Sequence, residues 1–107
     1  MKQLFISLLI ALTFFSCGSD DLPECIDTIL DDFRVTACPG QGELTTWRFR
    51  GELVYCFDWG ACQPEQFVEI YDAECNLICE LGGPDFIDVC AGSEWASAEF
   101  RSVEFRQ

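Results

Sequence analysis

The residues best suited to chemistry in this 107-residue chain are its eight cysteines, because the chain contains no histidine. Without an imidazole it lacks the usual general base near neutral pH and the usual partner that activates a serine or cysteine nucleophile. Nineteen acidic residues furnish carboxylate pairs in any fold, so such pairs do not indicate a glycosidase. The sequence therefore predicts no enzyme, no catalytic residue and no cofactor.

Cys17 stands apart from the other cysteines because it follows an apolar segment. Residues 1–3 carry one positive charge, and residues 4–15 are apolar except for two hydroxyl residues. Twelve helical residues span about 18 Å, less than the roughly 30 Å of a bilayer core, so the segment is typical of a secretory signal. The sequence Ser16-Cys17 resembles the lipobox of bacterial lipoproteins, which implies cleavage before Cys17 and acylation of that residue. More than one acyl chain holds a protein stably on a membrane.

The surroundings of Cys17 leave an alternative open. Phe14 stands where the lipobox pattern prefers leucine, and an ordinary secretory signal would leave Cys17 as a disulfide partner. Residues 18–21 (GSDD) resemble an export signal to the outer leaflet of the outer membrane, although they would also form a flexible tether. We therefore expect a lipoprotein signal peptide over residues 1–16, a lipidated cysteine and acidic tether over 17–22, and one domain over 23–107.

The charge of the chain restricts its partners. Nineteen Asp and Glu against six Lys and Arg give a formal net charge of −13. Nucleic acid is not expected as a partner, because phosphate contacts need clustered basic residues. Anionic lipid repels such a surface, so the anchor at Cys17, and not charge, is expected to provide membrane attachment.

The seven remaining cysteines predict a domain cross-linked by disulfides, since eight cysteines in so short a chain are typical of an oxidising compartment. They are Cys25, Cys38, Cys56, Cys62, Cys75, Cys79 and Cys90. An odd number allows at most three disulfides and leaves one thiol free or paired between chains. Their spacings lack the Cys-x2-Cys knuckles of zinc sites, so we expect no bound metal.

Two further groups of residues have both a possible functional role and a structural interpretation. Glu80, Asp85 and Asp88 surround a Gly-Gly-Pro break, but they lack the alternating spacing of a calcium loop, so a solvated loop is expected. Among the aromatic residues, Trp59 lies in a connection with Gly60 and is the candidate contact for a protein or glycan partner. Packing in the core is the alternative, as for most aromatic rings in a small domain.

These residues must be positioned by one helix and several strands. Apolar residues recur at helical spacing over residues 23–34, which predicts a helix. Residues 45–50, 53–57, 67–71 and 77–79 predict strands. A three-residue turn over residues 50–52 is expected, because it places the apolar residues of the first two strands on one face. Residues 93–100 predict a short helix opened by Ser93, and Val103 and Phe105 predict a last edge strand.

The economical arrangement of these elements is an α+β fold. In it, one N-terminal helix packs on an antiparallel β-meander of about four to five strands, stabilised by disulfides. The chain resembles a family of small cysteine-containing lipoproteins of Bacteroidota, classed as a domain of unknown function. The resemblance covers residues 24–106 and is carried by Cys25-Ile26 with Phe33, residues 47–55 (WRFRGELVY), and residues 71–79 (YDAECNLIC) before Gly82-Gly83.

The chain departs from the family pattern in two places. The family has a double cysteine where Ala61-Cys62 stands, and a longer loop where residues 82–90 run. The missing cysteine accounts for the odd count. Because Cys38 and Cys56 are additions to the pattern, the resemblance implies that they pair with each other.

The expected function is that of an uncharacterised, non-enzymatic lipoprotein of the cell envelope. We expect it to be anchored through Cys17 to the outer membrane, at the cell surface or facing the periplasm, where it acts as a binding or structural module. The second hypothesis is a small inhibitor of secreted hydrolases, because a helix on a disulfide-bonded meander is a frequent inhibitor build; this analogy concerns the fold alone.

Overall fold

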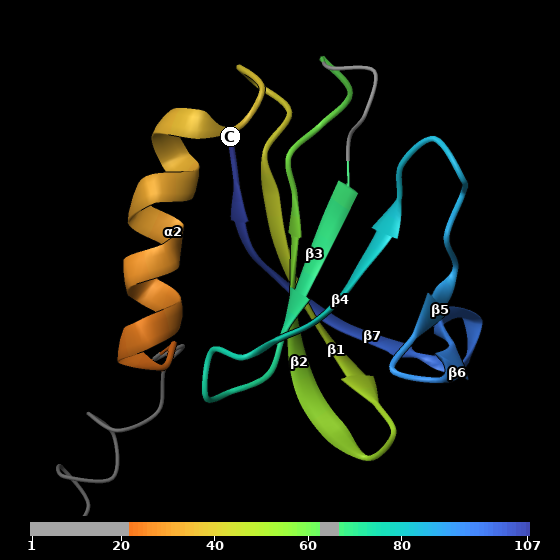
Figure 1. Cartoon of the computed structure of the whole chain (residues 1–107). Coiled ribbons are helices and arrows are strands. Elements are labelled where there is room, and N and C mark those ends of the chain that lie inside the picture. The colour runs from red at the N-terminus through yellow and green to blue at the C-terminus, as the bar shows by residue number, and fades with distance from the viewer. Residues whose placement is uncertain (1–21, 63–66) are drawn as a thin grey trace, which may run out of the picture.

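The computed structural model describes residues 22–62 and 67–107, which form one helix packed on an antiparallel sheet (Figure 1). The helix is α2 (Glu24–Thr36). The strands of the sheet are β1 (Glu43–Phe49), β2 (Glu52–Asp58), β3 (Phe67–Tyr71), β4 (Leu77–Gly82) and β7 (Glu99–Arg106), in the spatial order β4-β3-β2-β1-β7. Strands β1 to β4 form a meander, and β7 returns to the other edge beside β1. The predicted α+β fold class is therefore confirmed.

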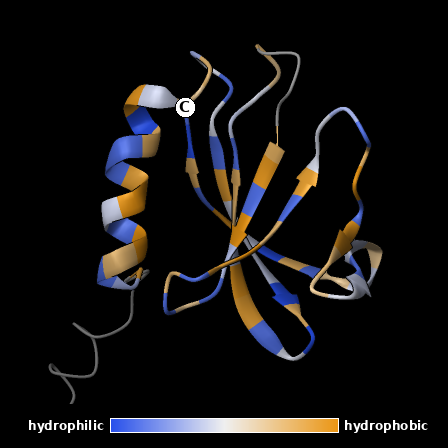
Figure 2. Cartoon of the chain, viewed as in Figure 1, coloured by the Kyte–Doolittle hydropathy of each residue, from blue (hydrophilic) through white to orange (hydrophobic). Residues whose placement is uncertain are grey.

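Helix α2 packs on one face of the sheet. Pro23 precedes its first residue, and Ile26, Leu30 and Phe33 are its buried residues. They pack against Leu44, Tyr55 and Phe57 of β1 and β2, and the rings of Phe33 and Phe57 meet edge to face at 5.1 Å. Hydrophobic residues recur along α2 and alternate with polar ones along the strands (Figure 2).

The opposite face of the sheet is also buried. A small two-stranded sheet, β5 (Val89–Cys90) and β6 (Ser93–Glu94), and a single 3-10 turn, η1 (Trp95–Ser97), supply its cover. The buried residues on this side are Phe49, Val54, Cys56, Ile70, Leu81 and Cys90. The Trp95 ring lies 5.3 Å from that of Trp47 and 5.1 Å from that of Phe49. The sheet therefore separates two apolar clusters.

The turn between β1 and β2 corrects a prediction. Phe49 pairs with Glu52, so the turn contains only Arg50 and Gly51, and the predicted three-residue turn is wrong. Both turn residues have positive φ, 54° and 80°, as a type I′ turn requires. The prediction assumed that the β1–β2 hairpin buries only one of its faces. Both faces are buried, so the apolar residues of β1 and β2 are divided between the two clusters.

The C-terminal tail corrects a second prediction. Residues 93–100 do not form a helix: β6, η1 and the start of β7 occupy them. Only one helical turn forms, because Ser93 pairs with Cys90 and the Trp95 ring is held against the sheet. The predicted edge strand around Val103 and Phe105 is confirmed, and two register shifts interrupt its pairing with β1.

Three disulfides cross-link the described residues, and one thiol is free, as the odd count predicted. The disulfides are Cys25–Cys75, Cys38–Cys62 and Cys79–Cys90. The pairing of Cys38 with Cys56, implied by the family resemblance, is wrong. Cys56 is buried within β2 on the face away from α2, whereas Cys38 follows α2 and meets Cys62 beyond the end of β2.

The predictions for the N-terminal segment lie outside the described residues. They concern the signal peptide over residues 1–16, Cys17 and residues 18–21 (GSDD). Within residues 22–62 and 67–107, no helix is long and apolar enough to cross a bilayer.

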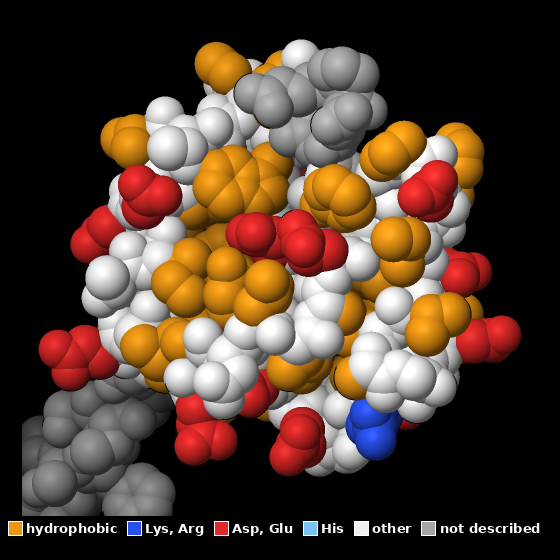
Figure 3. Space-filling view, viewed as in Figure 1, with side chains coloured by type: hydrophobic (Ala, Val, Ile, Leu, Met, Phe, Trp, Pro, Cys, Tyr) orange, Lys and Arg blue, Asp and Glu red, His pale blue; other side chains and the backbone are white. Residues whose placement is uncertain are grey.

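Acidic side chains are spread over the surface. Figure 3 shows them around the rim of one face and at its centre, with apolar side chains between them and little basic surface. The ion pair found in the described residues joins Arg106 to Glu43, whose side-chain atoms lie 2.6 Å apart. Most acidic side chains of residues 22–62 and 67–107 therefore have no basic partner within ion-pair distance.

Candidate functional site

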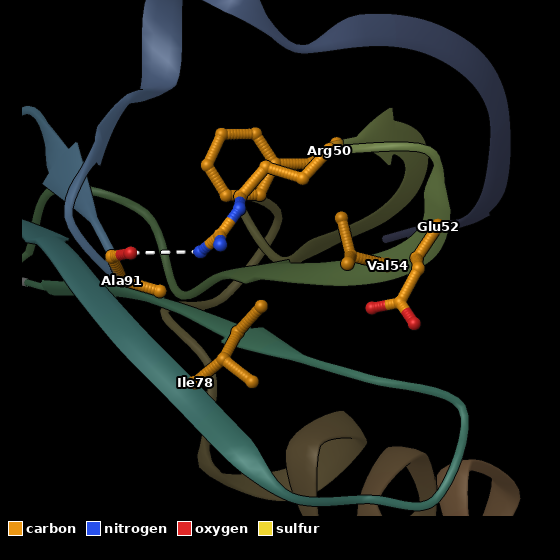
Figure 4. A pocket seen from close by; sticks show the side chains of 6 residues that line it. Arg50, Glu52, Val54, Ile78 and Ala91 are labelled. Carbon is orange, nitrogen blue, oxygen red and sulfur yellow. Dashed lines mark hydrogen bonds between the residues drawn. The ribbon is translucent and has the colours of Figure 1, made fainter.

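A cleft with mixed polar and apolar walls lies beside the β1–β2 turn (Figure 4). Its volume is about 380 Å³, and it is lined by Phe49, Arg50, Glu52, Val54, Ile78 and Ala91. Three separate parts of the chain form it: the β1–β2 hairpin, strand β4, and the turn between β5 and β6. The second buried cluster of the sheet forms the base beneath it.

Arg50 is held in place by a contact between two tight turns. Its Nη1 donates a hydrogen bond of 2.8 Å to the carbonyl oxygen of Ala91, drawn as a dashed line in Figure 4. Ala91 and Gly92 have positive φ, 48° and 84°, so the β5–β6 turn has the same backbone form as the Arg50-Gly51 turn. The contact fixes the small sheet to the tip of the hairpin.

The chemistry of this cleft suits binding. The Arg50 guanidinium carries five N–H donors, and the hydrogen bond to Ala91 uses one of them. Val54 and Ile78 provide an apolar surface between Arg50 and the carboxylate of Glu52 (Figure 4). The six lining residues include no serine, threonine, cysteine or lysine. The arrangement can hold a small apolar group that carries a polar end.

A second, smaller cleft of about 240 Å³ lies on the other side of the hairpin, beside the β3–β4 turn. Asp72, one of its three acidic lining residues, has a structural role: Oδ1 accepts 2.9 Å hydrogen bonds from the backbone N–H groups of Asn76 and Glu74. Hydrogen bonds from Asn76, which have the largest effect, and from Glu74 lower the pKa of Asp72 below its usual value. The carboxylate therefore closes a turn, and we assign it no ligand.

Trp59 is half-buried at the edge of the first cluster. Its ring lies 4.8 Å from that of Phe33, and its carbonyl accepts a 2.9 Å hydrogen bond from the Cys38 N–H. Part of the Trp59 ring thus packs in the core, and the role of Trp59 as a contact residue remains a prediction. Of the other aromatic residues, Tyr55 is buried, and Trp47, Tyr71 and Trp95 pack against the two clusters.

The structure does not bring together the carboxylates considered as calcium ligands. Glu80, Asp85 and Asp88 are all exposed, and residues 22–62 and 67–107 contain no group of three or more potential metal ligands. The segment that contains two of them has another feature, which the sequence analysis missed. Phe86 is highly exposed between Asp85 and Asp88, and the signal for it was an aromatic residue two positions after a Gly-Gly-Pro break.

Comparison with known proteins identifies the family. A family model described as "Domain of unknown function (DUF6970)" matches residues 35–90. Because the match covers more than half of the chain, the protein belongs to this family. The matched region is shorter than the expected resemblance over residues 24–106 and begins near the end of α2. Neither a curated protein nor a solved structure matches the chain.

Proposed function

We propose that the protein is a non-enzymatic lipoprotein of the cell envelope, of the kind found in Bacteroidota, whose cross-linked domain binds a partner outside the cytosol. The observation that carries this proposal is the set of three disulfides in the described residues. Such bonds form and persist in oxidising compartments and are rare in the cytosol. They support export, for which residues 1–16 would provide the signal and Cys17 the anchor.

Binding is a better match than catalysis for the surface of this domain. The cleft at the β1–β2 turn combines apolar walls with one cation and one anion, and its lining contains no serine, threonine, cysteine or lysine. The chain contains no histidine to supply a general base. A rigid domain with mixed clefts and exposed aromatic side chains has the properties of a recognition module.

Lipid acylation is tested by intact mass spectrometry of the protein taken from membranes. We expect a mature chain that begins at Cys17, carries acyl groups and contains three disulfides. Cys17→Ala should release the protein from the membrane fraction, because the remaining surface is acidic and is repelled by anionic lipid.

The matched control is Cys56→Ala, which also removes a cysteine that forms no disulfide but leaves Cys17 intact. This variant should remain in the membrane fraction. A water-soluble wild-type product that begins at another residue would contradict the anchor.

A second candidate function is inhibition of a secreted hydrolase. One observation favours it: the segment between β4 and β5 is closed by the Cys79–Cys90 disulfide and displays Phe86 to solvent. Inhibitors commonly present such a constrained, exposed loop. Hydrolase activity measured with and without the purified protein separates the two functions, and a broad panel without inhibition would remove the second.

A further inference from the structure

The segment from the end of β4 to the first residue of β5, which we call the Phe86 loop (residues 83–89), exposes three large apolar side chains. Phe86 is 85% exposed, the highest value among the large hydrophobic residues that the structure describes as exposed. Ile87 and Val89 in the same loop are 41% and 47% exposed. Exposed aromatic side chains that stand close to other apolar ones are typical of contact sites for protein partners.

The base of the loop is fixed from three sides. Backbone hydrogen bonds of 2.8 and 3.0 Å join Gly82 and Ile87 in both directions, and the Cys79–Cys90 disulfide encloses the whole segment. Gly83 lies so close to the Phe67 ring that an added Cβ would come within 2.5 Å of it. The loop is therefore held in one shape before any partner arrives, which lowers the entropy cost of binding.

The backbone at Phe86 is unfavourable for this residue. Its φ is 52°, in the left-handed region that glycine or asparagine adopts far more easily. Contacts within the domain do not explain the choice of phenylalanine, because its side chain is almost wholly exposed. A strained backbone that displays a large aromatic side chain to solvent is the pattern of a residue kept for contact.

Charge and position indicate the kind of partner. Asp85 and Asp88 flank the aromatic residue, and residues 82–90 contain no Lys or Arg. The loop lies at the upper right in Figure 1, whereas α2 begins at the lower left, so the loop is far from the end of the domain at which residue 22 enters. A lipid anchor at Cys17 would thus leave the loop directed away from its own membrane, toward other proteins.

We propose that the Phe86 loop docks a folded protein that offers an apolar pocket for the Phe86 side chain and basic residues at the rim for Asp85 and Asp88. The proposal names the partner surface of the binding function proposed above, and only the direction of the loop away from the membrane rests on the anchor.

The test replaces Phe86 with the photoreactive analogue p-benzoylphenylalanine in the full chain, in the cells that produce it. The matched position is Val35 on α2, which is 80% exposed and carries no flanking strain. Irradiation should yield a discrete protein adduct from position 86 and none from position 35. The cross-linked protein is then identified by mass spectrometry and purified for affinity measurements.

With that partner, Phe86→Ala should weaken binding about tenfold or more, whereas Phe86→Trp should retain it and Val35→Ala should change it less than about twofold. Asp85→Asn with Asp88→Asn should slow association and reduce its dependence on salt. The unfolding midpoint of Phe86→Ala should not fall, which separates a contact role from a structural one.

Three results would overturn the proposal: no protein adduct from position 86, equal adducts from both positions, or an affinity of Phe86→Ala within twofold of the wild type. An adduct with lipid alone counts as the first result. The acyl groups on Cys17 are measured in the same membrane sample. An unacylated chain would contradict the anchor, while the adducts still decide the role of Phe86.

Discussion

Cys56 shows how a single residue resolves the odd cysteine count. It is the free cysteine of the described residues, buried within β2 beside Thr45. Burial, with a smaller contribution from nearby acidic side chains, raises the pKa of its thiol from near 9 to about 12. The thiol is therefore protonated in the folded protein over the whole physiological range and is shielded from oxidants and from the neighbouring disulfides.

This burial predicts a pH dependence of stability. Because the folded pKa lies above the unfolded value near 9, the contribution of the neutral thiol is complete below pH 9 and is lost as the pH rises toward 12. Between pH 9 and 10, below the usual pKa of tyrosine, the free energy of unfolding should decrease by up to about 1.4 kcal/mol per pH unit. Denaturant unfolding at several pH values measures this slope.

Cys56→Ala is the matched variant for that measurement. It should show a lower stability at pH 7, because a buried side chain is shortened, but a much flatter dependence between pH 9 and 10. An equal slope in both proteins would assign the alkaline loss to another group.

At the scale of the elements, disulfides hold together segments that the chain places far apart. Cys25–Cys75 spans 50 residues and joins the first turn of α2 to the β3–β4 turn, whereas Cys79–Cys90 spans 11 residues. Cross-links that close longer loops remove more entropy from the unfolded chain. The Cys25–Cys75 bond is therefore expected to stabilise the fold more than the Cys79–Cys90 bond.

The double variant Cys25→Ala/Cys75→Ala should lose about 4 kcal/mol of unfolding free energy, and Cys79→Ala/Cys90→Ala about 3 kcal/mol. Urea unfolding under non-reducing conditions measures both. A larger loss from the shorter loop would show that packing of the buried Cys90 side chain outweighs chain entropy.

Features that depend on neighbouring residues could be predicted from the sequence, whereas features that depend on distant segments could not. Strand β3 has the predicted bounds, residues 67–71, because its short run of β-branched and aromatic residues is a local signal. The β1–β2 turn was wrong because the cover of the second face comes from Trp95, more than 40 residues away from the turn. The partners of Cys38 and the cleft around Arg50 likewise depend on segments that only the folded chain brings together.

On the scale of the whole molecule, the dominant property is a net charge of −13. Acidic side chains are scattered over the face seen in Figure 3, and a surface of this charge is repelled by anionic bilayers. Edge strand β7 carries charged residues of both signs (Glu99, Arg101, Glu104 and Arg106), and its register with β1 shifts twice. Both features discourage unwanted pairing of the edge with other chains.

This charge predicts that the anchor alone accounts for membrane binding. Cys17→Ala protein should show no measurable sedimentation with phosphatidylglycerol vesicles at low salt, whereas acylated wild-type protein should sediment with them. Neutral phosphatidylcholine vesicles provide the control for charge. Vesicle binding by the Cys17→Ala protein would reveal a second membrane contact within the domain.

The Cys25–Cys75 bond has a mechanical consequence. With an anchor at Cys17, the domain would come under tension whenever a bound partner was dragged by flow, and the pull would enter through the first turn of α2. There the Cys25–Cys75 bond would pass the load directly into the β3–β4 turn. The helix would then not unfold residue by residue, and the central sheet would bear the force.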